Sequence, residues 1–208
     1  MKIKLCGIRR FEDISYVNEF KPDYIGFVFA QSKRQISADF AAKLKAKLDG
    51  GIKTVGIFVN SSLKETAHTA EKAGLNVIQL HGDENESFIS SLRNITDCEI
   101  WKAVRIRTAE DIINGESMDA DKLLLDSYSP ESYGGTGKRA DLDIIKKANI
   151  KTPFFFFFGL NKDNIISALR CVSPFGADIS GGIETNGFKD KNKIKEIINL
   201  VRSADFES

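Results

Sequence analysis

The segment Asp178-Ile-Ser-Gly-Gly-Ile-Glu184 decides the fold of this chain, together with the earlier segment Phe157-Phe-Gly-Leu-Asn161. Each segment closes an apolar run with a turn of small residues, which predicts a buried strand followed by a helix. Two such turns side by side can direct backbone N–H groups at one phosphate without an intruding side chain. After the last two strands of a (β/α)8 barrel, this is the usual phosphate site. The two segments therefore predict a barrel that binds a phosphorylated small molecule.

Apolar runs alternate with helical patterns over the rest of the chain. Eight runs predict strands: Ile3–Cys6, Tyr24–Phe29, Thr54–Val59, Val77–Leu80, Glu99–Val104, Lys122–Leu125, Phe154–Phe157 and Ala177–Ile179. They are largely continuous in apolar character, as expected for parallel strands that are covered on both faces. Eight strand–helix units in 208 residues predict an α/β fold, a small (β/α)8 TIM barrel in which residues 1–208 form one domain. A doubly wound open sheet is the alternative, but it usually has a glycine-rich turn where this chain has Cys6-Gly-Ile-Arg9.

Capping patterns predict where several helices begin: at Ser37, at Ser62 with Glu65, and at Asn161. The helix after Ser37 is expected to stop at Gly50-Gly51. The last helix is expected to bury residues spaced by three or four positions: Ile194, Ile197, Ile198 and Val201. The weakest helical pattern is Thr108–Asp119, where Gly115 is expected to interrupt any helix.

The composition is that of an ordinary globular protein, with 42% hydrophobic and 28% charged residues. The 30 basic and 29 acidic residues are interspersed and leave a net charge of +1, so no nucleic-acid partner is expected. No apolar stretch reaches the ~20 residues of a membrane span, and the N-terminal apolar stretch is too short for a signal peptide. Cys6, Cys98 and Cys171 have neither paired nor metal-type spacing, which fits a reducing compartment and predicts a cytoplasmic protein.

Polar side chains follow the C-terminal ends of several predicted strands, where barrel enzymes place their chemistry. The residues in these positions are Cys6, Arg34, Gln79, His81 and Asp126. The informative segments around them are Lys4-Leu-Cys-Gly-Ile-Arg9, Gly26-Phe-Val-Phe-Ala-Gln-Ser-Lys-Arg34, Val55-Gly-Ile-Phe-Val-Asn60, Gln79-Leu-His-Gly82, Leu124-Leu-Asp-Ser127, Gly134-Gly-Thr-Gly137 and Asp178-Ile-Ser-Gly-Gly-Ile-Glu184. In these segments and in their order, the chain resembles phosphoribosylanthranilate isomerases. The segments together cover nearly the whole chain, which makes the resemblance specific.

The resemblance implies an isomerase of tryptophan biosynthesis. The family converts N-(5-phosphoribosyl)anthranilate into 1-(2-carboxyphenylamino)-1-deoxyribulose 5-phosphate by an Amadori rearrangement, with neither a metal nor an organic cofactor. By the same resemblance, Asp126 is the general acid that opens the ribose ring and Cys6 is the general base at C2. The implied partner is a small phosphorylated substrate, with no membrane, and the chain is expected to be a monomer or a homodimer.

The remaining site residues are expected to bind substrate. Arg34 is suited to the anthranilate carboxylate because a guanidinium binds such a group through two N–H bonds. Gln79 and His81 are expected to line the pocket, although both could instead brace a loop by hydrogen bonds. The phosphate is expected near the two glycine turns, at Gly159, Asp178, Ser180, Gly181 and Gly182.

Two features leave alternatives open. The family usually has Gly-Gly-Leu after the seventh strand, whereas this chain has Phe158-Gly159-Leu160. The Phe158 ring either packs away from the phosphate site or displaces the turn. The glycine-containing segment Tyr128–Lys138 is interpreted as a flap over the substrate. The competing functions are a non-catalytic phosphosugar-binding barrel and another phosphosugar enzyme, such as a pentose-phosphate epimerase or an indole-glycerol-phosphate synthase.

Overall fold

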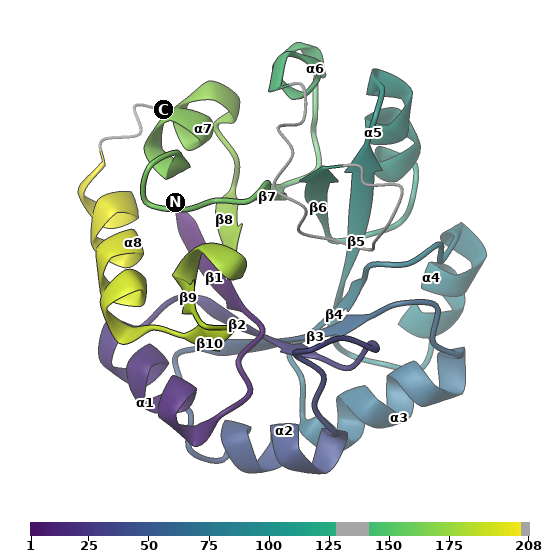
Figure 1. The fold of residues 1–208 in the computed structure, drawn as a ribbon. Coiled ribbons are helices and arrows are strands. Elements are labelled where there is room, and N and C mark those ends of the chain that lie inside the picture. The colour runs from purple at the N-terminus through teal and green to yellow at the C-terminus, as the bar shows by residue number, and fades with distance from the viewer. Residues whose placement is uncertain (128–141, 205–208) are drawn as a thin grey trace.

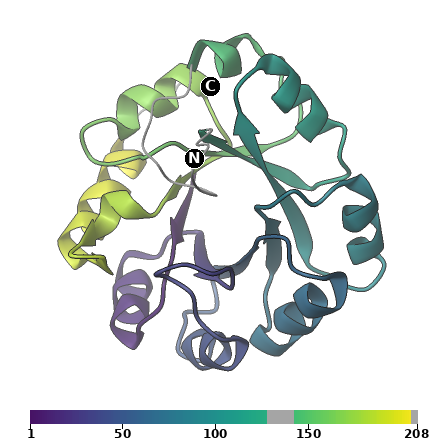
Figure 2. The same ribbon diagram turned by 45° about the vertical axis from the view of Figure 1, so that its right-hand side comes forward.

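Eight parallel strands form a closed barrel in the computed structural model, which describes residues 1–127 and 142–204. Each strand is hydrogen-bonded to the next in chain order, and β8 closes the ring on β1, where Asp178 lies opposite Lys4. The helices surround the barrel on its outside (Figures 1 and 2). The predicted α/β barrel is therefore confirmed, and the open sheet is excluded.

The strands are β1 (Lys2–Cys6), β2 (Tyr24–Val28), β3 (Lys53–Phe58), β4 (Val77–Leu80), β5 (Glu99–Ile106), β6 (Lys122–Ser127), β7 (Phe154–Phe157) and β8 (Gly176–Ile179). The helices are α1 (Phe11–Phe20), α2 (Ala38–Lys45), α3 (Leu63–Ala73), α4 (Glu86–Arg93), α5 (Ala109–Glu116), α6 (Leu142–Lys147), α7 (Ile165–Val172) and α8 (Lys191–Ser203). After β8, a short 3-10 helix η1 (Gly181–Ile183) leads into a hairpin of β9 (Glu184–Thr185) and β10 (Phe188–Lys189). All eight predicted strands are present.

Two apolar cores hold the barrel together, because successive side chains of a strand point to opposite faces. In β1, Ile3 and Leu5 face the helices and belong to the outer core. The lower interior of the barrel is filled by a second cluster: Tyr24, Val55, Val77, Trp101, Ala103, Leu124 and Phe155. The Trp101 and Phe155 rings are stacked with centroids 4.7 Å apart and close the bottom of the barrel.

The helix predictions are confirmed in part. The side chains of Ser37 and Ser62 accept hydrogen bonds from backbone N–H groups and cap α2 and α3 as expected. However, α2 already ends at Lys45, and α7 begins after Asn164, because Asn161 caps the preceding turn instead.

The expectation that Gly115 interrupts the helix is wrong. Helix α5 runs through Gly115, and a Cβ at this position would lie 2.4 Å from Cγ2 of Val104 on β5. Glycine is therefore a packing residue that lets this helix lie close to the strand.

The Phe158 ring packs away from the barrel mouth. It is 8% exposed, belongs to the outer core, and stacks on Phe156 with ring centroids 4.4 Å apart. The next residue, Gly159, has φ +55°, which glycine adopts without strain. The first of the two alternatives for Phe158 is therefore confirmed.

The expected flap, Tyr128–Lys138, lies outside the described residues. Within the described parts of the chain, no helix combines the length and apolar character that crossing a bilayer requires.

Candidate active site

A cavity of about 860 Å³ lies at the C-terminal ends of the barrel strands. Its wall contains nine of the predicted site residues: Cys6, Arg34, Gln79, His81, Gly159, Asp178, Ser180, Gly181 and Gly182. The tenth, Asp126, is fully buried and contacts the cavity residue His81. The structure thus brings together side chains from β1, β4, β6 and β8 and from the loop after β2.

Cys6 is the last residue of β1 and lies beside two buried charged groups. The Lys4 ammonium, on the same face of β1, forms an ion pair with Asp178 inside the barrel, and both side chains are almost fully buried. Burial by itself would lower the pKa of Lys4, but the charges and hydrogen bonds of Asp178 and Cys6 together outweigh burial and raise it, so Lys4 stays cationic. A charged group buried next to a thiol shifts the pKa of the thiol and so changes the fraction present as thiolate.

Burial raises the pKa of the Cys6 thiol, and Asp178 adds to this effect. Lys4, Lys189 and Arg34 oppose it without overcoming it. The general-base role that the resemblance implies for Cys6 requires the thiolate. The structure places cations near Cys6 but leaves the thiol favoured.

Gln79, His81 and Asp126 form a hydrogen-bonded row across the cavity floor. The Gln79 amide nitrogen lies 3.1 Å from His81 Nδ1, and His81 Nε2 lies 3.1 Å from Asp126 Oδ2. When the Gln79 amide donates to Nδ1, the ring proton is on Nε2 and is donated to Asp126. His81 therefore fixes the orientation of the Asp126 carboxyl group.

Three buried oxygens near the cavity accept no hydrogen bond from any residue in 1–127 or 142–204. They are Gln79 Oε1, Asp126 Oδ1 and Asp178 Oδ1. Leaving such a group unpaired costs about 1–3 kcal/mol. Because these acceptors gather around one cavity, they are suited to a ligand that carries several O–H or N–H donors.

The two glycine turns lie against each other, as the sequence predicts. A Cβ on Gly182 would lie 1.9 Å from the carbonyl oxygen of Leu160, so the turn after β8 contacts the turn after β7 through backbone atoms. A Cβ on Gly181 would meet nothing within 4 Å. Together with Gly159, these residues give the cavity a wall of backbone.

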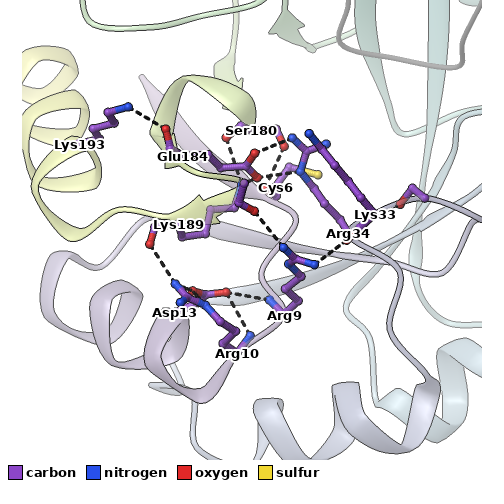
Figure 3. A network of polar contacts seen from close by, with 12 residues as sticks. Cys6, Arg9, Arg10, Asp13, Lys33, Arg34, Ser180, Glu184, Lys189 and Lys193 are labelled. Carbon is purple, nitrogen blue, oxygen red and sulfur yellow. Dashed lines mark hydrogen bonds and ion pairs between the residues drawn. The ribbon is translucent and has the colours of Figure 1, made fainter.

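Arg34 is held by the protein rather than extended into solvent. Its side chain is 22% exposed, and it forms two hydrogen bonds with Glu184, as Figure 3 shows. Glu184 and its other partner, Lys189, belong to the hairpin that follows η1.

Sequence reasoning assigned no role to Lys4, Glu184 or Lys189, and it assigned Phe157 to strand and core. Phe157 does lie in β7, but its side chain lines the cavity and meets the His81 ring edge-on. A signal was present for Lys4, because a lysine two residues before Cys6 must share its inward face. No comparable signal exists for the hairpin residues.

The chain is matched over residues 3–200 by the family model described as N-(5'-phosphoribosyl)anthranilate (PRA) isomerase. The chain belongs to the phosphoribosylanthranilate isomerase family. An N-(5'-phosphoribosyl)anthranilate isomerase of Thermoanaerobacter sp. (strain X514) is 43% identical over 202 residues, which cover 97% of this chain and 98% of that protein.

Solved structures of phosphoribosylanthranilate isomerases have the same fold. The Thermotoga maritima phosphoribosyl anthranilate isomerase superposes with a TM-score of 0.88 at 31% identity, covering 98% of this chain and 100% of the other. A phosphoribosyl anthranilate isomerase in complex with reduced 1-(o-carboxyphenylamino)-1-deoxyribulose 5-phosphate has a TM-score of 0.84 at 29% identity, with the same coverage.

Proposed function

We propose that this chain catalyses the Amadori rearrangement of N-(5-phosphoribosyl)anthranilate to 1-(2-carboxyphenylamino)-1-deoxyribulose 5-phosphate in tryptophan biosynthesis. The observation that carries the proposal is that one cavity is lined by a thiol, a guanidinium and two glycine turns, and that the buried Asp126 carboxyl group is hydrogen-bonded to the cavity residue His81. The thiol and the carboxyl group are suited to act as base and acid, and the guanidinium and the glycine turns are suited to bind the carboxylate and the phosphate of the substrate. The family to which the chain belongs supports the same reaction.

Asp126 is the proposed general acid. As the C1–O bond of the ribose breaks, its proton passes to the ring oxygen, and the lone pair of the anthranilate nitrogen forms the C1=N bond of a Schiff base. The hydrogen bond to His81 holds Oδ2 of the carboxyl group, while Oδ1 is buried and has no hydrogen-bond partner among the described residues.

Cys6 is the proposed general base. It removes the C2 proton, the electron pair of that bond forms the C1=C2 double bond, and the C=N electrons return to nitrogen. The resulting enolamine tautomerises to the ketone. The Lys4 and Lys189 ammonium groups lower the pKa of Cys6 and so oppose its burial, which raises that pKa.

The substrate's two anions are assigned to two different groups of cavity residues. The phosphate lies at the backbone of Gly159, Gly181 and Gly182, and the anthranilate carboxylate lies at Arg34. The unpaired oxygens of Gln79 and Asp178 then accept hydrogen bonds from donors of the substrate. A cytoplasmic location, a single domain over residues 1–208, and a monomeric or homodimeric state belong to the same proposal.

The test is the loss of anthranilate-type fluorescence when purified protein meets freshly made phosphoribosylanthranilate. Rapid loss with the wild type and none with Asp126→Ala is the expected result. Tight binding of a reduced product analogue without turnover would instead support a non-catalytic phosphosugar-binding barrel.

A further inference from the structure

The Arg34 guanidinium uses only one of its two bidentate edges within the protein. Its Nε and Nη2 atoms donate to Glu184 Oε1 and Oε2 at 2.7 and 2.8 Å. A guanidinium has five N–H donors, so the edge formed by Nη1 and the second Nη2 hydrogen remains. No residue in the described ranges accepts a hydrogen bond from Nη1, and Arg34 lines the cavity.

Glu184 is itself held by a buried cation, whose hydrogen bond goes to the same oxygen, Oε1, that accepts from Arg34 Nε. Lys189, whose side chain is 1% exposed, donates to Glu184 Oε1 at 2.8 Å and to the Ser180 carbonyl at 3.0 Å. Burial by itself would raise the pKa of Glu184, but the bonds from Arg34 and Lys189 outweigh it and lower the pKa to about 2. Two cations face one anion here, so the cluster keeps a net positive charge that can attract a second carboxylate.

The hairpin that carries Glu184 and Lys189 is fastened to the N-terminal part of the barrel (Figure 3). Arg9 donates to the Gly187 carbonyl at 2.9 Å, and Arg10 donates to the Lys189 carbonyl at 3.0 Å. Both guanidinium groups also lie over the Phe188 ring, 4.7 and 4.8 Å from its centroid. These contacts fix the position from which Glu184 reaches Arg34.

The aliphatic part of the Arg34 side chain packs against Gly7. A Cβ on Gly7 would lie 2.5 Å from Arg34 Cδ, and Gly7 has φ +83°, a conformation that other residues rarely adopt. The arginine is therefore held along its stem by the turn after β1 and at one guanidinium edge by Glu184.

We propose that Glu184 is a positioning residue that holds Arg34 with its remaining guanidinium edge toward the cavity, ready for the carboxylate of the substrate. This inference rests on the proposed function. Lys189 balances the charge of Glu184, so that Arg34 is fixed without losing its attraction for the substrate. The long arginine side chain is thus ordered before binding, which reduces the entropy cost of forming the complex.

The experiment compares Glu184→Gln with the wild type on phosphoribosylanthranilate and on the phosphoribosylaniline analogue, which lacks the carboxylate. We expect KM for the first substrate to rise about 10- to 100-fold with little change in kcat, because a hydrogen-bonded charged contact is misplaced. KM for the analogue should stay the same. Equal losses on both substrates, or no loss on either, would overturn the proposal.

Matched variants separate positioning from general damage. Glu196→Gln removes the same charge from an exposed ion pair with Lys162 and should behave as the wild type. In an Arg34→Ala background, Glu184→Gln should add no further change in KM. If Glu184→Gln unfolds, Glu184→Asp keeps the charge beside Lys189 but withdraws the carboxylate, and it should reproduce the selective rise in KM.

Binding keeps this test distinct from that of the proposed function. If the wild type turns over neither substrate, the proposed reaction is wrong, and the Kd of the reduced product analogue is measured instead. A weaker Kd in Glu184→Gln would still support positioning by Glu184, and an unchanged Kd would overturn it. If the wild type neither turns over substrate nor binds the analogue, both proposals fail.

Discussion

The lower and upper halves of the barrel interior are built from the same strand faces, but the lower half is apolar and the upper half is polar. In β4 and β6, Val77 and Leu124 belong to the lower apolar cluster, whereas Gln79 and Asp126 lie two residues further along. Two residues of a strand span about 6.6 Å. Within this distance the interior changes from close apolar packing to paired charges and unsatisfied oxygens.

The difference follows from what lies next to each half. The lower half is buried and apolar, so it is stabilised by close packing of Tyr24, Trp101 and Phe155. The upper half faces a cavity, where polar groups can keep partial hydrogen bonding and remain available to a ligand. In this barrel, residues at the C-terminal ends of the strands are placed for chemistry, whereas residues further from those ends stabilise the fold.

The largest effect on activity is expected from substitutions in the upper half of the barrel interior. Asp126→Ala and Cys6→Ala should each lower kcat by about 10²–10⁴-fold, because each removes a group that transfers a proton in the reaction. Steady-state kinetics with circular dichroism as a folding control checks this prediction. A rate close to that of the wild type in either variant would remove that residue from the mechanism.

A substitution in the lower half should reduce stability and leave activity almost unchanged. Leu124 lies on the same face of β6 as Asp126. The substitution Leu124→Ala leaves a cavity among buried residues. We expect a loss of about 2–5 kcal/mol in the free energy of unfolding, with kcat per folded molecule almost unchanged. Urea denaturation and active-site titration measure the two quantities. A fall in kcat without loss of stability would contradict the separation of the two halves.

The pH profile sharpens the description of the upper half. Because burial raises the pKa of Cys6 above its ordinary value of 9.0, the thiolate fraction of the unliganded protein grows throughout the neutral and mildly alkaline range. We therefore expect the rate at which iodoacetamide alkylates Cys6 to increase with pH up to at least about pH 9. Alkylation rates of the wild type over this range, with Cys6→Ala as the background, test the prediction. A plateau that begins below neutral pH would show that the cations around Cys6 outweigh its burial.

The smallest effect on the site is expected from a residue outside both halves. Phe158→Gly removes a ring from the outer core, so it should lower the melting temperature but leave the affinity for a phosphate-bearing product analogue unchanged. Calorimetric titration and thermal unfolding distinguish these results. A large loss of affinity in a folded variant would mean that the ring supports the phosphate turn directly.

Much of the candidate site could be predicted because strand ends are readable from sequence. Cys6, Gln79 and Asp126 each lie at or next to the C-terminal end of an apolar run, and the barrel rule brings such positions to one mouth. Glycine was harder to interpret. Gly182 was placed correctly as part of a turn, whereas Gly115 was mistaken for a helix breaker, because its role depends on the contact with Val104.

The eight strands, the barrel and the residues around its mouth follow from the amino-acid sequence, because hydrophobic runs and turns are local patterns. Which charged side chains meet depends instead on the folded arrangement. The Lys4–Asp178 pair exists because β8 closes on β1, and Arg34 meets Glu184 across 150 residues of chain. Such pairs depend on strand register and on the path of one hairpin, and neither leaves a periodic signal in the sequence.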